Sequence, residues 1–133
     1  KHISLAAARN NAIQHAKGDL IAILDSDDFW DENKLMSQVE IFTKYRDVSL
    51  CFTDAMRVDV NENPIISFSY EKKNSNKNFF ESLILTSFIP CSSSMFKKNV
   101  FDKVGKFDES FSQVEEWDLW LKIAAKFQIM KSF

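Results

Sequence analysis

The chain has 133 residues, of which 45% are hydrophobic and 27% charged, a composition typical of a globular protein. Its 17 basic and 19 acidic residues give a net charge of −2, which argues against a nucleic-acid partner bound through a basic surface. No apolar run approaches the roughly 20 residues that a membrane-spanning helix needs. Cys51 and Cys91 are too few for a disulfide scaffold, so we expect two free, buried thiols.

The first segment predicts a helix, a buried strand and an acidic turn. Ser4 is the expected N-cap, because its hydroxyl can accept from an unpaired backbone N–H, and Gly18 is the expected C-terminal cap. Apolar residues recur between them at helical spacing, at Leu5, Ala8, Ala12 and Ala16. The unbroken apolar run at 20–24 is typical of a strand buried on both faces, and Asp25 follows it. This order indicates an α/β unit.

A second helix is predicted from 31 to 46, followed by a strand at 48–52. The helix carries apolar residues at i, i+4 and i+7: Leu35, Val39 and Phe42. Residues 54–78 are polar and predict an irregular loop, and 79–85 predict a short helix.

A last helix follows an acidic cluster, and its apolar face consists of Trp120, Ile123, Ala124 and Phe127. Residues 128–133 resemble the beginning of a strand, and the first residues lead directly into a helix. We therefore expect both ends to lie inside a structured domain and the chain to be a piece of a longer protein.

The first candidate site is the acidic run Asp25-Ser26-Asp27-Asp28. Three carboxylates directly after a buried strand repel one another unless a cation compensates them. Ligands of open α/β sheets bind at the carboxyl ends of the strands, and Mg²⁺ and Mn²⁺ prefer carboxylate oxygens. The pattern therefore favours a metal that joins this loop to a diphosphate. The alternative is a turn in which Asp28 or Asp31 caps the next helix.

The second candidate site is the run Glu115-Glu116-Trp117-Asp118 before the last helix. One interpretation is structural: the helix dipole stabilises acidic residues at a helix N-terminus, and Asp118 can pair with Lys122. The functional interpretation is a general base that removes the proton of an attacking sugar hydroxyl. Trp117 and Trp120 are more often core residues than platforms for a sugar ring.

Several runs together resemble the family 2 glycosyltransferases of the GT-A fold. They are Ala8-Arg9-Asn10, Ala16-Lys17-Gly18-Asp19, Leu24-Asp25-Ser26-Asp27-Asp28-Phe29-Trp30 with Lys34-Leu35, Gly105-Lys106-Phe107-Asp108-Glu109, and Glu115-Glu116-Trp117-Asp118-Leu119-Trp120-Leu121-Lys122. Their order and spacing agree over almost the whole chain. A DxD motif alone would be a weak signal, but its combination with the later acid–aromatic block is a strong one.

The resemblance implies transfer of a sugar, with inversion, from a nucleotide diphosphate sugar to a glycan or lipid-linked acceptor. Asp25 would face the ribose side of the donor, and Asp27, with Asp25, would hold Mg²⁺ or Mn²⁺. Asp28 would support them and Arg9 would approach the diphosphate. On the acceptor side, with Glu115, Trp117 and Trp120, Glu116 would be the general base. The resemblance also implies a role in surface polysaccharide synthesis and a cytoplasmic location. Peripheral association of the longer protein with the inner face of the membrane is compatible with it.

The chain departs from the family pattern at three places. The usual base is Asp, and Glu116 reaches about an ångström further, so Asp118 is a second candidate. Lys106 replaces a Gly. The strand–helix–strand unit that normally begins such domains and binds the nucleotide base is missing. Residues 1–133 are thus expected to be the central and C-terminal part of one GT-A domain, with a mixed sheet incomplete at both ends.

Two other classes of function remain open. The first is a non-catalytic sugar- or nucleotide-binding module of the same fold, which loss of the base residue would favour and which Glu116 in place of Asp leaves open. A phosphohydrolase of the haloacid dehalogenase type also places DxD after an apolar strand. That family, however, has Thr or Val two residues beyond the second Asp, where this chain has Phe29.

Overall fold

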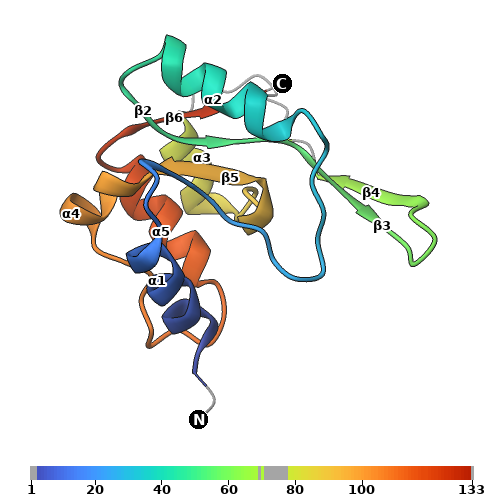
Figure 1. Ribbon diagram of the computed structural model, residues 1–133, viewed down its shortest axis with the longest axis horizontal. Helices are drawn as coiled ribbons and strands as arrows, with labels where there is room; N and C mark the ends of the chain where they lie inside the picture. Colours follow the sequence, from blue (N-terminus) through green and yellow to red (C-terminus); the bar gives the residue numbers. More distant parts are fainter. Residues whose placement is uncertain (1–2, 69, 71–77, 133) are drawn as a thin grey trace.

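A computed structural model describes residues 3–68, 70 and 78–132 (Figure 1). The helices are α1 (Leu5–His15), α2 (Lys34–Lys44), α3 (Phe79–Leu85), α4 (Phe101–Val104) and α5 (Glu115–Ala124). The strands are β1 (Leu20–Ala22), β2 (Val48–Phe52), β3 (Ala55–Val58), β4 (Pro64–Phe68), β5 (Ser94–Lys97) and β6 (Gln128–Lys131). Two short 3₁₀ turns, η1 (Cys91–Ser93) and η2 (Lys98–Val100), flank β5.

Four strands form one mixed sheet in the order β1-β5-β2-β6. β5 lies antiparallel to both of its neighbours, so that Phe96 is opposite Ile21 on one side and Leu50 on the other. β2 and β6 run parallel. The predicted α/β fold with a mixed central sheet is confirmed.

Helices cover both faces of this sheet. In Figure 1, α2 lies above the sheet and α1 and α5 lie below it, and α3 packs against α5. The larger core lies on the lower side and joins strand residues to these three helices: Ile21, Leu50, Phe52, Phe96 and Ile129 with Ala6, Ile13, Leu83, Leu119, Trp120 and Ile123. The smaller core lies under α2 and contains Phe42, Val48, Cys51 and Met95. Apolar residues on both faces explain why β2 is buried along its whole length.

The first helix begins as predicted and ends earlier than predicted. The Ser4 hydroxyl accepts a hydrogen bond from the Ala7 N–H and caps α1. Its C-cap is Ala16 in an extended conformation, so the prediction that Gly18 caps this helix is wrong. Of the two glycines, Gly105 has the positive φ, at 81°, and it ends α4.

The predicted apolar face of the second helix is wrong for two of its three residues. Phe42 is buried, but Leu35 and Val39 are 42% and 43% exposed. The side chains buried beside Phe42 are Lys34 and Gln38, which hydrogen bond to each other. Apolar spacing could not anticipate this arrangement, because here buried polar groups satisfy one another inside the fold.

The segment predicted as an irregular loop contains a hairpin that projects from the body of the molecule (Figure 1). β3 and β4 pair antiparallel, with Arg57 opposite Ile66, and a turn at 59–63 connects them. Residues 69 and 71–77 of that loop lie outside the described part of the chain. Among the described helices, none is both long and apolar enough to cross a membrane.

Candidate functional site

The two predicted acidic segments meet at one buried arginine. Arg9 extends from α1, and its Nη2 donates to both carboxylate oxygens of Asp25 at 2.8 and 3.1 Å. Its Nη1 donates to Glu115 Oε1 at 2.6 Å. Arg9 and Glu115 are buried, whereas the Asp25 side chain is 32% exposed. The structure thus joins the end of β1, helix α1 and the first turn of α5 through charge-assisted hydrogen bonds.

The acidic loop after β1 is attached at both ends to Ser92. The Asp25 backbone N–H donates to Ser92 Oγ at 3.0 Å, and Trp30 Nε1 donates to the Ser92 carbonyl at 2.8 Å. Between these anchors, Asp27 and Asp28 are exposed, and neither carboxylate makes a hydrogen bond or ion pair within the described residues. These two carboxylates are therefore available to a ligand.

The alternative interpretation of this loop, a side-chain cap for the next helix, does not apply. The N-cap of α2 is Asn33, and no side chain caps that helix. Asp31 instead accepts from the Asn33 N–H, one residue before the helix begins. The acidic residues of the loop are thus not explained by capping.

The first turn of α5 presents three acids in different surroundings. Glu115 is buried in its pair with Arg9, and Asp118 pairs with Lys122 as the spacing predicted. Glu116 is half-buried, and its carboxylate has no hydrogen-bond or ion-pair partner in the part of the chain that the structure describes. Val114, just before the helix, has a φ of 60°, which is strained for a β-branched residue. Of the three acids in this turn, Glu116 is therefore the one whose carboxylate has no partner within the described residues.

The two tryptophans of the acid–aromatic block have separate environments. Trp120 is fully buried and packs against Phe96 and Phe107, so it has no ring face to offer to a sugar. Trp117 is half-buried, and its Nε1 donates to the Leu83 carbonyl at 2.7 Å. Of the two, Trp117 alone keeps some exposed surface.

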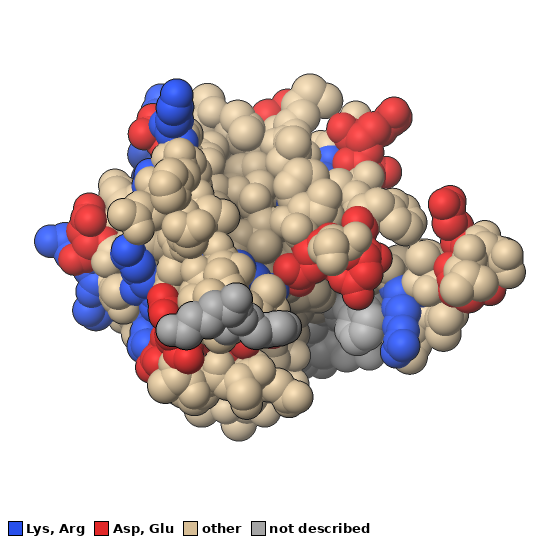
Figure 2. Space-filling model, turned by 60° about the horizontal axis from the view of Figure 1, so that its bottom comes forward, with Lys and Arg blue, Asp and Glu red and all other residues tan. Residues whose placement is uncertain are grey.

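Figure 2 shows how charge is distributed on one face of the molecule. Lys and Arg side chains stand mostly on the left, among acidic ones, and carboxylates gather near the centre and on the right. On this face the charges do not form a continuous basic surface.

Sequence reasoning missed two residues that build the site. Asn10 joins two of the motif runs: its Nδ2 donates to the Phe107 carbonyl and to Glu109, and its Oδ1 accepts from the Phe107 N–H. Its position beside Arg9 in a motif was the available signal. Ser92 had none, because only the fold brings it to the acidic loop.

A buried thiol lies close to these charges. Cys91 is 7% exposed, and Arg9, Asp25, Glu115 and Glu116 all act on it electrostatically. Burial raises the pKa of Cys91 to about 12 and that of Cys51 to about 11. Both cysteines are free, as predicted.

We expect both thiols to react slowly with a thiol reagent at pH 8. The fraction of thiolate sets the rate, so the folded protein should react at least about a hundredfold more slowly than the same protein in guanidinium. Because each pKa is raised from 9.0, each buried thiol contributes stability that is complete below pH 9 and is lost as the pH rises towards 11 to 12. Rates within a fewfold of the unfolded protein would contradict the burial of these groups.

The donor set of the loop fits a divalent cation that is shared with a ligand. Within the described ranges, no three His, Cys, Asp or Glu side chains are arranged to enclose a metal. Mg²⁺ is commonly held by one or two carboxylates together with phosphate oxygens and water rather than by a full protein cage. The Asp27 carboxylate has no partner within the described residues, whereas both carboxylate oxygens of Asp25 already accept from Arg9 and its side chain is 32% exposed.

The mixed α/β sheet, with helices on both faces and acidic groups after its first strand and in its last helix, is consistent with a GT-A-like fold. The family model for glycosyl transferase family 2 matches residues 2–105, and the chain belongs to that family. It is 31% identical to an uncharacterised glycosyltransferase, MJ1057, of Methanocaldococcus jannaschii, over 100% of this chain and 46% of that protein.

Relatives with named activities are also similar. The Escherichia coli UDP-Glc:alpha-D-GlcNAc-diphosphoundecaprenol beta-1,3-glucosyltransferase WfgD is 30% identical over 89% of this chain and 43% of that protein. The chondroitin synthase of Escherichia coli is 27% identical over 93% of this chain and 17% of that protein. The chain spans about half the length of the first relatives it matches, at 46%, 48% and 43%.

Proposed function

We propose that the protein transfers a sugar from a nucleotide diphosphate sugar to a glycan or lipid-linked acceptor, with inversion. The observation that carries this proposal is the Arg9 bridge, which joins Asp25 of the acidic loop to Glu115 in the first turn of α5. We infer that the donor-side acids of the loop after β1 and the acceptor-side acid Glu116 of α5 take part in the same reaction. The family, and a relative named for transfer to a diphosphoundecaprenol-linked sugar, support this direction.

In the proposed reaction the acceptor hydroxyl attacks the anomeric carbon of the donor sugar. Glu116 takes the hydroxyl proton as the new C–O bond forms, and the bond to the diphosphate breaks with its electron pair on the leaving oxygen. Asp27, assisted by Asp25, would hold Mg²⁺ or Mn²⁺, which neutralises charge on a departing diphosphate. Asp118 is paired with Lys122, which makes Glu116 the preferred base. We place this reaction in the cytoplasm, where nucleotide sugars are made, in polysaccharide or glycolipid synthesis.

The experiment that tests donor binding is a thermal shift of the full-length protein with nucleoside diphosphates, with and without Mn²⁺. A ligand at 100 times its Kd should stabilise the fold by about 2.7 kcal/mol. We expect Asp27→Asn to lose the Mn²⁺-dependent part of the shift, because the amide removes a charged ligand. Asp31→Asn is the matched control, since Asn keeps the oxygen that accepts from Asn33. Equal shifts in Asp27→Asn and the unaltered protein would overturn the metal role of Asp27.

A further inference from the structure

A buried lysine begins α2 beside the end of the acidic loop. Lys34 is 7% exposed; its Nζ donates to Gln38 Oε1 at 2.8 Å and lies 4.3 Å from the centre of the Trp30 ring. No described carboxylate lies within ion-pair distance of this Nζ. Burying a cation without a counter-charge is unfavourable, and burial lowers the pKa of Lys34 to about 8. The contacts of the Lys34 ammonium group indicate why a charged side chain occupies this buried position.

On one side, Lys34 is attached to the sheet through Gln38. Gln38 is fully buried, and its Nε2 donates to the carbonyl of Cys51 on β2 at 3.2 Å and to that of Ser93 in η1 at 2.9 Å. The amide can satisfy both carbonyls only with its oxygen turned towards Lys34. The ammonium group is therefore held in one place by the backbone of two other elements.

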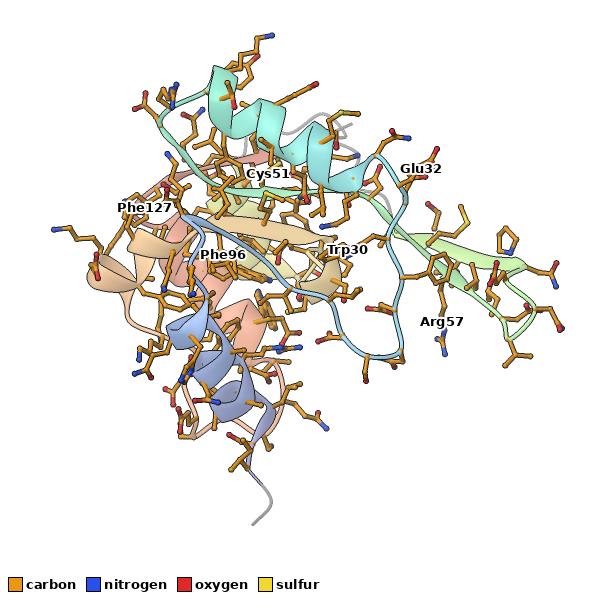
Figure 3. All side chains as sticks on the ribbon, viewed as in Figure 1. Trp30, Glu32, Cys51, Arg57, Phe96 and Phe127 are labelled. Carbon is orange, nitrogen blue, oxygen red and sulfur yellow. The ribbon has the colours of Figure 1, made fainter. Side chains whose placement is uncertain are left out.

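On the other side, Lys34 holds the ring of Trp30. Trp30 ends the acidic loop, and its N–H donates to the Ser92 carbonyl, so the ring is fixed at its edge by Ser92 and at its face by the lysine. Figure 3 shows Trp30 beneath the first turn of α2, at the same end of the sheet as the loop, with Cys51 under the helix. Asp27 and Asp28 lie between this anchor and the Asp25–Ser92 anchor.

We propose that Lys34 is a positioning residue: through Trp30 it fixes the C-terminal end of the acidic loop, and so sets the place of the Asp27 carboxylate for donor binding. The donor part of this statement rests on the proposed function, whereas the loop part does not. Lys34 touches no donor atom in this account. It acts because the loop, between its two anchors, has little other attachment to the core.

The test compares hydrogen–deuterium exchange of residues 24–30 in the full-length protein and its variants. Lys34→Met keeps the unbranched shape and most of the length of the side chain and removes both the charge and the donor, so the loop amides should exchange about tenfold faster. Lys34→Arg keeps a cation over the ring and should restore most of the protection. Trp30→Phe, which loses the bond to Ser92, should accelerate the same amides and stands in if Lys34→Met does not fold.

Two controls on the same helix separate positioning from stability. Lys44→Met removes an exposed lysine of α2 and should leave exchange of 24–30 unchanged. Phe42→Leu weakens the packing of α2 without touching Trp30, and should destabilise the protein while sparing the loop. The proposal is overturned if Lys34→Met exchanges at 24–30 like Lys44→Met, or if Phe42→Leu accelerates the loop as much as Lys34→Met does.

A second measurement, the Kd for UDP with Mn²⁺, tests the donor part. We expect Lys34→Met to weaken binding about tenfold and Lys34→Arg to recover most of it. Unchanged affinity in Lys34→Met, with a loop that exchanges faster, would overturn the link to donor binding. Absence of binding in the unaltered protein would overturn the proposed donor instead, and the exchange result would still decide whether Lys34 positions the loop.

Discussion

Glu116→Gln should lower kcat by about a hundredfold to ten-thousandfold, the usual contribution of a general base. The amide keeps the size and the hydrogen-bonding oxygen of the side chain, but it cannot take the proton of the acceptor hydroxyl. Because Glu116 has no protein partner within the described residues, the substitution should leave the fold and its thermal stability unchanged. The measurement is turnover of the full-length protein with a donor and acceptor that it accepts.

A measurement of donor binding distinguishes loss of the general base from loss of the whole site. Glu116→Gln should bind nucleoside diphosphate and Mn²⁺ as the unaltered protein does, since the proposed donor side lies in the other acidic segment. Asp118→Asn is the matched control: it breaks the surface pair with Lys122 and should change kcat only a few-fold. Equal turnover in Glu116→Gln and the unaltered protein would exclude Glu116 as the base.

Arg9→Met should destabilise the protein by about 3–5 kcal/mol, because it leaves a buried carboxylate without its counter-charge. Glu115 has a 4% exposed side chain and pairs with Arg9 at 2.6 Å, so it has no access to compensating water. Asp25, which is 32% exposed, can be hydrated and should contribute less to the loss. Urea unfolding of the two proteins measures the difference.

A double variant identifies the cause of that loss. In Arg9→Met with Glu115→Gln, the buried charge is absent, and part of the lost stability should return. Arg9→Lys keeps one positive charge but lacks the planar guanidinium group that donates to both carboxylates. Its free energy of unfolding should lie between those of the unaltered protein and Arg9→Met. If the double variant is as unstable as the sum of its two single variants, the penalty comes from lost packing of Arg9 and not from the stranded carboxylate.

Elements with an unambiguous pattern were predictable. The strand expected at 48–52 and the helix expected at 79–85 coincide with β2 and α3. The hairpin of β3 and β4 was not predicted, because Met56, Ile65 and Ile66 are exposed and the strands lack a clean alternation of buried and polar residues. The pattern of apolar and polar residues in a sequence reflects which residues are buried. Strands that bury few residues, such as β3 and β4, are therefore hard to predict from that pattern.

The acidic segments of the site could be recognised from the sequence, but their connection could not. The Arg9–Glu115 contact spans 106 positions along the chain, and no local pattern predicts it. The resemblance implies that Arg9 approaches the diphosphate, and this stays a prediction; in the structure both amino groups of Arg9 donate to carboxylates. The burial of Lys34 was hidden for another reason: a charged residue at a helix start normally indicates solvent.

The strand order of the main sheet has a consequence for the synthesis of the chain. Within the described residues, β1 pairs with β5, some seventy-five residues later, and β2 pairs with β5 and β6, so every pairing in this sheet joins strands that are distant in sequence. A nascent chain must therefore emerge as far as Lys97 before β1 has a partner, and as far as Glu115 before Arg9 has both of its own. At roughly 5–20 residues per second, the acidic loop waits several seconds without its supports. Charged residues that flank an unpaired apolar strand oppose its aggregation, and Asp25, Asp27 and Asp28 follow the apolar run at 20–24 in this way.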